Sequence, residues 1–273
     1  YSPEREDPGN PEHSTSKIPK VVGGTDEASL DVADALYKQI VVSTVRVSST
    51  ETAEAVKLLE NIFRSVNIAL VNELKLVYSK LGIDVWEVIE AAKTKPFGFM
   101  AFYPGPGLGG HCIPIDPHYL TWKAKMNGVE PRLIELAGQI NSQMPAFTVG
   151  RIADGLNEKS QSLRGANLLA LGVAYKRDVN DVRESPALEV LHTLHEKGAI
   201  LRYADPYVPQ VEVNGTELHA VELTPEVLAW ADSVIMLTDH AAFDADLIVK
   251  HSPLIVDCRN AFQNFRDPHI LRL

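Results

Sequence analysis

The longest regular pattern of apolar and polar positions lies between residues 50 and 80. This stretch contains neither proline nor glycine, and its apolar residues recur at intervals of three and four, which predicts one long amphipathic helix. Further helices are expected at 84–94, 117–128 and 131–159. The middle of the chain is therefore predicted to be all-helical.

After residue 165 the pattern changes to short apolar runs that alternate with helical segments, the first helix covering 185–197. The expected strands lie within "NLLALGVAY", "AILRYADP", "DSVIMLTD" and "PLIVDCRN". Uniformly apolar strands separated by helices indicate a parallel sheet covered on both faces, so we predict a Rossmann-like, doubly wound domain. Its ligand should bind beyond the carboxyl ends of the strands, where "AYKRDVNDVRESP" and "DCRNAF" would lie.

The first 49 residues predict a small α/β piece. "PKVVGG" and "VVSTVRVSS" have strand composition, and "TDEASLDVADALYKQI" predicts a capped helix between them. The polar opening, "YSPEREDPGNPEHSTSKIPK", has the composition of a loop that leaves a strand, with nothing before it. We therefore expect a fragment in which 1–49 is the tail of an α/β domain, 50–160 a central helical domain and 161–273 a C-terminal domain.

Composition narrows the class of protein. The 273 residues are 45% hydrophobic and carry a net charge of -10 without a dense basic run, which argues against a nucleic-acid-binding face. No apolar run has the length of a membrane span, and no signal peptide opens the chain. Cys112 and Cys258 are far apart, so neither a disulfide framework nor a zinc cluster is expected, and a reducing, cytoplasmic setting fits best. His192 and His195 share a helix face without further ligands, so no metal site is predicted.

The stretch "YPGPGLGGHCIPIDP" poses a question, because its glycines at 105, 107 and 110 match the G-x-G-x-x-G pattern of dinucleotide-binding turns. That pattern needs a strand before it and a helix at its last glycine. "FMAFYP" is a poor strand and Pro114 follows closely, so the cofactor-loop interpretation fails. The glycines are instead expected to let the backbone approach a ligand or another loop.

Cys112 would be presented at the edge of this loop. Asp116 follows four residues later, and a helix beginning near Pro117 would place the thiol at a helix N-terminus, whose dipole stabilises a thiolate. The alternative is a small buried side chain in a packed turn, as for most cysteines and as expected for Cys258. A thiol hydrolase using His111 is disfavoured, because adjacent side chains diverge and no protease signature surrounds them.

The long helix carries a polar stripe. Lys57 and Asn61 are one turn apart between apolar neighbours, and Arg64 and Asn67 extend the stripe. A solvated face would explain Lys57. Asparagine is a poor choice at exposed helix positions, however, so Asn61, Asn67 and Asn72 together indicate a buried stripe that serves a ligand.

These segments resemble a known family. "SPER", "AEAVKLLEN", "GPGLGGHCIPIDP", "GVAYKRDVNDVRESPA" and "VDCRN" occur in the order found in the nucleotide-sugar 6-dehydrogenases, the UDP-glucose/GDP-mannose dehydrogenase family. The resemblance covers essentially the whole chain. "HCIPIDPHYLTWKA" with "SPEREDPG" is more similar to enzymes acting on UDP-N-acetylhexosamines than to UDP-glucose 6-dehydrogenases, which remain the alternative. The resemblance also implies that most of an N-terminal NAD-binding domain is absent.

The resemblance implies a four-electron oxidation of a sugar C6 alcohol to the carboxylate, with NAD as cofactor. Cys112 would attack the C6 aldehyde to give a thiohemiacetal and then a thioester, which water opens. Lys57 and Asn61, matching the family's Lys-x-x-x-Asn, would stabilise the oxyanions. Asp116 would orient or deprotonate the water.

Other positions carry over with one departure. Glu4 is a further candidate acid or base, but the second glutamate of other members is replaced by Pro8, which leaves the assignment of the base open. The resemblance assigns Arg183 to NAD. It assigns the following to the UDP-sugar: the backbone of Tyr103, Gly105, Gly107 and Gly109, together with Tyr175, Lys176 and Arg259.

Two functions are therefore carried forward. The first is an NAD-dependent dehydrogenase of a UDP-sugar, homodimeric through the long helix, with neither nucleic acid nor membrane as partner. The second is that this chain by itself binds UDP-sugar and dimerises without catalysing the oxidation.

Overall fold

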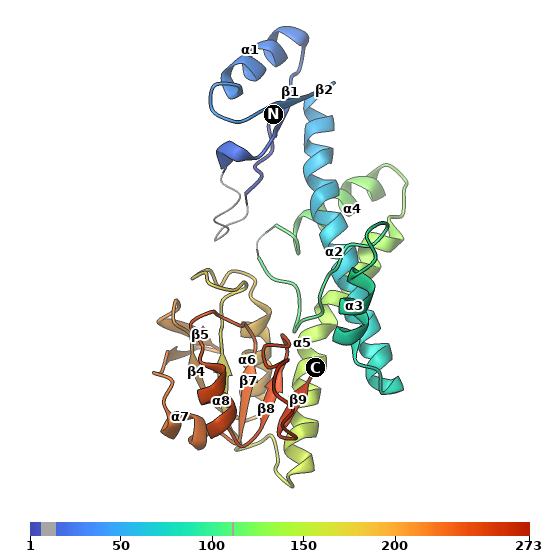
Figure 1. The fold of residues 1–273 in the computed structure, drawn as a ribbon. Coiled ribbons are helices and arrows are strands. Elements are labelled where there is room, and N and C mark those ends of the chain that lie inside the picture. The colour runs from blue at the N-terminus through green and yellow to red at the C-terminus, as the bar shows by residue number, and fades with distance from the viewer. Residues whose placement is uncertain (7–14, 111) are drawn as a thin grey trace.

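The structure is a computed structural model that describes residues 1–6, 15–110 and 112–273. Three parts follow one another along the chain, as Figure 1 shows. The first contains a 3-10 turn (Thr15–Lys17), β1 (Lys20–Gly23), α1 (Glu27–Tyr37) and β2 (Thr44–Val47). Because β1 and β2 pair in parallel, this part is the small α/β unit that the sequence predicts.

The middle part is helical. It consists of α2 (Thr50–Leu81), α3 (Val85–Lys93), α4 (Asp116–Met126) and α5 (Arg132–Glu158). Ser49 caps α2 by accepting a hydrogen bond from the Thr52 amide, and Gly82, at a φ of 69°, ends it in the left-handed conformation that glycine adopts easily. The long helix is therefore confirmed, and it packs against α4 and α5.

The C-terminal part is a doubly wound domain, as predicted. Its elements are β3 (Asn167–Leu171), α6 (Pro186–Glu196), β4 (Ile200–Ala204), β5 (Gln210–Val213), β6 (Thr216–His219), α7 (Pro225–Trp230), β7 (Ser233–Met236), α8 (Ala245–His251), β8 (Ile255–Asp257) and β9 (Ile270–Arg272). Five strands form a parallel sheet in the order β4-β3-β7-β8-β9. The order reverses between β3 and β7, which defines the crevice where such sheets bind ligands.

Successive residues of β3 enter two different cores. Leu168 and Ala170 pack with residues of α5 and α6, whereas Leu169 and Leu171 pack with residues of α7 and α8. Side chains alternate across a strand, so a strand buried on both faces must be apolar throughout. α5 therefore belongs to both parts, since it contacts α2 at one end and covers the sheet at the other (Figure 1).

Four of these elements were not predicted. β5 and β6 form an antiparallel hairpin around Asn214 and Gly215, whose φ values of 50° and 77° are those of a type I′ turn. α8 and the edge strand β9 are the others. None of the helices in the described part of the chain is both long and apolar enough to span a membrane.

Candidate functional site

The glycine-rich segment forms neither helix nor strand in residues 101–110 and 112–115. "FMAFYP" forms no strand, and the next helix, α4, begins only at Asp116. This geometry agrees with rejecting a dinucleotide-binding turn for the G-x-G-x-x-G pattern.

The glycines allow close approach to the C-terminal domain. A Cβ on Gly105 would lie 2.6 Å from Nη1 of Arg259, and one on Gly109 would lie 2.9 Å from Cβ of Tyr175. At Gly107, where φ is 149°, it would lie 2.7 Å from Cβ of Pro186. Real side chains do not come this near, so the loop packs against the second domain only because these positions lack a side chain.

Buried asparagines hold the loop from its other side. Asn72, fully buried on α2, accepts a hydrogen bond from the Gly105 amide at 3.1 Å and donates one to Oδ1 of Asn141 at 3.0 Å. Asn141 in turn donates to the Ser65 carbonyl at 3.1 Å. Asn72 is buried as expected and positions the Gly105 backbone, while a ligand role for this stripe stays a prediction. Asn67 is only half-buried and donates to the Phe63 carbonyl one turn earlier.

Asn61 is the buried asparagine that meets the candidate nucleophile's turn. Its side chain is fully buried, and its Nδ2 donates to Oδ2 of Asp116. The Asp116 amide donates to the carbonyl of Cys112 at 2.8 Å, in the turn that leads into α4. Cys112 itself is half-buried and free. Two segments far apart in the sequence thus meet around the thiol-bearing turn.

Lys57 lies one turn before Asn61 and reaches the N-terminal segment. Its Nζ donates to the carbonyl oxygen of Glu4 at 2.8 Å. The Glu4 residue is exposed, so the structure brings Lys57 to the Glu4 main chain. Lys57 and Arg64 also line an open groove of about 600 Å³ between α2 and the first segment of the chain.

Two candidate cations of the C-terminal domain, Lys176 and Arg259, follow β3 and β8. Nε of Arg259 donates to the Leu237 carbonyl at 2.8 Å, and its amide donates to Asp257. Burial lowers the pKa of Arg259, although the charge of Asp239 opposes this effect. Tyr175 and Lys176, both half-buried, follow β3.

Asp257 was not singled out from the sequence, yet it shapes this end of β8. Its carboxylate accepts hydrogen bonds from the amides of Arg259, Ala261 and Phe262. Burial raises the pKa of Asp257, while these three amides oppose the shift. The signal in the sequence is an aspartate directly after an apolar strand, followed by a turn.

Two predicted binding residues make side-chain contacts within their own segments. The ring of Tyr103 stacks on Trp86 with 5.9 Å between the ring centroids, and its hydroxyl donates to Glu90 of α3 at 2.6 Å. The guanidinium of Arg183 is exposed and pairs with Asp181 at 2.6 Å. In this conformation each side chain is engaged within its own segment.

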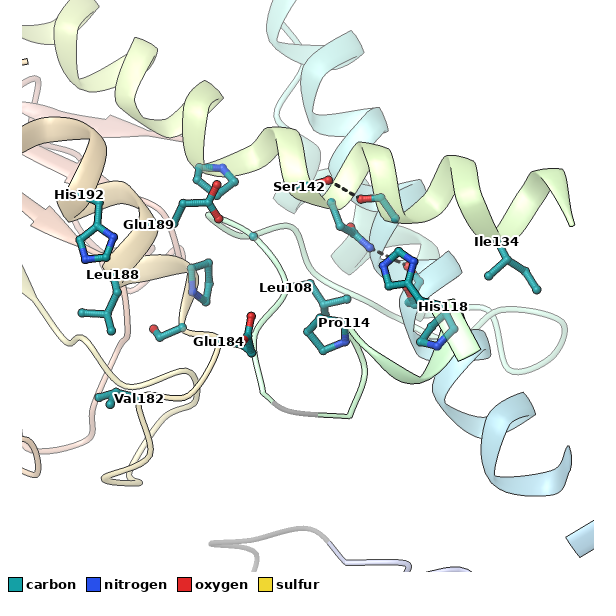
Figure 2. A pocket seen from close by; sticks show the side chains of 18 of the residues that line it. Leu108, Pro114, His118, Ile134, Ser142, Val182, Glu184, Leu188, Glu189 and His192 are labelled. Atoms are coloured by element: carbon teal, nitrogen blue, oxygen red, sulfur yellow. Dashed lines mark hydrogen bonds between the residues drawn. The ribbon is translucent and has the colours of Figure 1, made fainter. Parts of the chain in front are cut away.

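A cavity of about 370 Å³ lies between the helical part and the C-terminal domain. Figure 2 shows Glu184, Glu189 and His192 on the side of the cavity that the C-terminal domain forms, with Ser142 and His118 across from them. The glycine loop contributes Gly107 and Leu108 to its wall.

The remaining residues considered in the sequence analysis lie away from the candidate site or outside the described residues. Cys258 is 1% exposed in the core, and burial raises the pKa of its thiol, which confirms it as a packing residue. His195 Nδ1 lies 3.3 Å from Nδ2 of Asn214. His111 and Pro8 lie outside the described residues.

Comparison with known proteins identifies the relatives of this fold. Residues 51–143 match the central domain of the UDP-glucose/GDP-mannose dehydrogenase family, and residues 169–264 match the UDP binding domain of the same family. The chain belongs to the UDP-glucose/GDP-mannose dehydrogenase family.

Its curated relatives include two dehydrogenases of N-acetylated nucleotide sugars. The UDP-N-acetyl-D-glucosamine 6-dehydrogenase of Pseudomonas aeruginosa is 35% identical over 254 residues, which cover 92% of this chain and 57% of that protein. The UDP-N-acetyl-D-mannosamine dehydrogenase of Pyrococcus horikoshii is 36% identical, covering 89% of this chain and 55% of that protein. The solved UDP-D-ManNAc dehydrogenase from Pyrococcus horikoshii has a TM-score of 0.85 and 32% identity, covering 99% of this chain and 63% of that one. The chain thus spans little more than half the length of the relatives it matches.

Proposed function

We propose that this chain supplies the UDP-sugar site and the thiol chemistry of a dehydrogenase that oxidises C6 of a UDP-N-acetylhexosamine to the carboxylate. The observation that carries the proposal is the junction of Asn61 and Asp116 beside the turn of Cys112. Two relatives support the substrate class, since both are named for N-acetylated UDP-hexosamines. A UDP-glucose substrate is the alternative.

The steps assigned to this chain begin with the C6 aldehyde. The Cys112 thiolate adds to the carbonyl carbon, a C–S bond forms, and the oxygen takes up a proton to give a thiohemiacetal. Loss of a hydride and that proton gives the thioester. Water then adds to its carbonyl, the C–S bond breaks, and the carboxylate and free thiol are left with release of a proton. Covalent capture keeps the aldehyde from escaping.

The neighbouring side chains have separate parts in these steps. Lys57 and the amide of Asn61 are a cation and a donor on one helix face, so they suit the negative oxygen that develops at C6. Asp116 is the acceptor that would orient the attacking water. Glu4 is a further candidate base, and its main chain already contacts Lys57.

The cofactor in the proposal is NAD, which accepts the hydrides when bound. The described residues do not by themselves form its site. Residues 1–6 and 15–49 contain only two paired strands, the G-x-G-x-x-G pattern lies in a loop without a preceding strand, and Arg183 is paired with Asp181. Hydride transfer is therefore not assigned to residues of this chain.

The UDP moiety is assigned to the mouth of the C-terminal sheet. The Arg259 guanidinium lies against Gly105, and Tyr175 against Gly109, so a diphosphate there would touch both the loop and the domain. Arg259 with Lys176 supplies the local positive charge that such a ligand needs in an acidic protein.

The proposed homodimer uses the helical part. Large apolar side chains on α2, α4 and α5 are exposed: Leu59, Phe63, Leu70, Val77, Tyr119, Trp122, Leu133 and Leu136. Leu59 is 67% exposed and Trp122 62%. α2, α4 and α5 contact one another, and exposed apolar side chains gathered on neighbouring helices are typical of protein interfaces. Sedimentation of the chain and of Leu70→Glu tests the pairing, which the glutamate should disrupt.

Calorimetric titration with UDP and with UDP-N-acetylglucosamine tests the binding part of the proposal. We expect Arg259→Gln to weaken both by roughly tenfold or more, the cost of losing a charge-assisted contact. Arg164→Gln, just before β3 and so at the opposite, amino end of the strands, is the matched control and should bind normally. Absence of binding by the wild-type chain, or equal binding by Arg259→Gln, would refute the site.

Turnover is tested separately by following NADH absorbance after adding NAD and the UDP-sugars. NADH formation would assign the complete oxidation to this chain. Silence together with UDP binding would favour the UDP-binding and dimerisation function.

A further inference from the structure

Arg64 lies three residues beyond Asn61 on α2. Its Nη2 donates a hydrogen bond to Oδ1 of Asn61. The other end of that amide, Nδ2, donates to Oδ2 of Asp116. Arginine has only donors, whereas an asparagine amide has one accepting and one donating end of nearly the same size. Arg64 therefore distinguishes the two ends of the amide.

The flipped orientation of the Asn61 side-chain amide, with its oxygen and nitrogen exchanged, is disfavoured at both atoms. Its oxygen would face the Asp116 carboxylate with no hydrogen between them, and its NH₂ group would face the guanidinium. Because Asn61 is completely buried, water cannot supply the missing partners, and each unmet bond carries its full desolvation cost.

Without Arg64, the amide of Asn61 would be oriented only as long as its hydrogen bond to Asp116 remained. In the proposed function Asp116 must also bind the water that opens the thioester, which competes for the same carboxylate. Arg64 does not take part in that exchange. Arg64 forms no ion pair with any residue in 1–6, 15–110 and 112–273. Its guanidinium lies beside Asn61, at the groove that Lys57 also lines.

We infer that Arg64 is a positioning residue that holds the donor end of Asn61 toward the Asp116–Cys112 turn throughout the reaction. The inference rests on the proposed function for its chemical consequence. Its structural content, a fixed amide, stands apart and can be measured in the isolated chain.

Three variants separate the possibilities. Arg64→Met keeps the aliphatic stem and removes every donor, Arg64→Lys restores one donor, and Lys80→Met removes an exposed cation from the far end of the same helix. Thermal unfolding verifies that each variant is folded.

The first measurement is hydrogen exchange of the Asn61 side-chain amide by NMR, with its signal assigned through Asn61→Asp. Removing a hydrogen bond to a charged donor should speed exchange by about tenfold or more in Arg64→Met. Arg64→Lys should recover most of the protection, and Lys80→Met should match the wild type. Unchanged exchange in a folded Arg64→Met would overturn the inference, because Asp116 would then suffice to hold the amide.

The second measurement uses p-nitrophenyl acetate to acylate Cys112, with Cys112→Ser as the blank. Release of nitrophenol reports attack by the thiol, and loss of the acetyl group, followed by mass spectrometry, reports thioester hydrolysis. Arg64→Met should slow deacylation about tenfold while acylation is unchanged, and Arg64→Lys should restore it. Equal slowing of both steps would indicate a general structural role and would refute the positioning role.

These readouts also separate the inference from the function. A wild-type chain that fails to bind UDP, yet loses amide protection in Arg64→Met, would refute the proposed function and retain the fixed amide. Normal UDP binding by the wild-type chain, with unchanged amide exchange in Arg64→Met, would support the UDP site and refute the fixed amide.

Discussion

Asn72 offers a direct test of how the candidate site is held together. It is completely buried and serves two partners at once, the Gly105 amide and the Asn141 side chain. Asn72→Ala removes both bonds without touching a residue assigned to chemistry. Asn67→Ala is the matched control, since Asn67 is half-buried on the same helix and bonds only to a carbonyl of its own turn.

The magnitude follows from what is left unpaired. Each buried donor or acceptor deprived of its partner costs roughly 1–3 kcal/mol, so two such groups cost about 3 kcal/mol if water entering the vacated space replaces part of the loss. For a protein of this size 1 kcal/mol corresponds to a shift of roughly 2–4 °C in Tm. Asn72→Ala should therefore lower Tm by about 6–12 °C, and Asn67→Ala by about 2 °C or less.

Calorimetry of both variants, with titration of UDP, measures the two consequences. Because Asn72 anchors the loop that touches Arg259, we expect weaker UDP binding in Asn72→Ala and unchanged binding in Asn67→Ala. Equal Tm values for the two variants would refute the assignment of Asn72 as the anchor. A large drop in Tm with unaltered UDP affinity would show that loop docking and ligand binding are independent.

Three further outcomes are expected. Burial lowers the pKa of Lys75 from 10.5 to about 8. Between these values the unfolded chain binds more protons than the folded one, so the free energy of unfolding should rise by about 3 kcal/mol from pH 8 to 10.5. In urea denaturation, the Lys75→Met variant should lack this rise and should be more stable than the wild type at pH 7. Gly109→Ala would place a Cβ 2.8 Å from Cδ of Pro186. Overpacking of this kind should lower the free energy of unfolding, measured by denaturant titration, by roughly 1–3 kcal/mol. The control Gly128→Ala, at an open turn, should show only local backbone strain. Cys112→Ser should abolish the covalent acetyl adduct in mass spectra, because the hydroxyl is a far weaker nucleophile than a thiolate, and an adduct of wild-type yield would remove Cys112 from the mechanism.

The sequence predicts the elements whose period is strong and local. α2 follows from apolar spacing and from the Ser49 and Gly82 signals at its ends, and the parallel sheet follows from strands that are apolar on both faces. The hairpin of β5 and β6 was missed although "VNGT" has the Asn-Gly turn and flanking alternation typical of such hairpins. β9 is too short and mixed in composition to show a pattern.

The site is predictable only in part, for a physical reason. Spacing places Lys57 and Asn61 on one helix face, but it does not show which asparagine bonds to a ligand-side group and which to backbone. The contacts that decide this, such as Asn61 with Asp116 and Asn72 with Gly105, join residues far apart in sequence. The glycine pattern likewise resembles a cofactor turn until the approach of the second domain explains it.

The environment of Arg259 bears on the proposed binding of a diphosphate by an acidic chain. Burial opposes the charged form of the guanidinium and lowers its pKa, yet arginine remains protonated in proteins, so the cost falls on folding. Nε is satisfied by the Leu237 carbonyl, and Nη1 lies toward the side-chain-free Gly105. A phosphate oxygen at this place would supply a charged acceptor and offset part of the desolvation. Positive charge held in advance by the fold, rather than a basic surface, would then select the ligand.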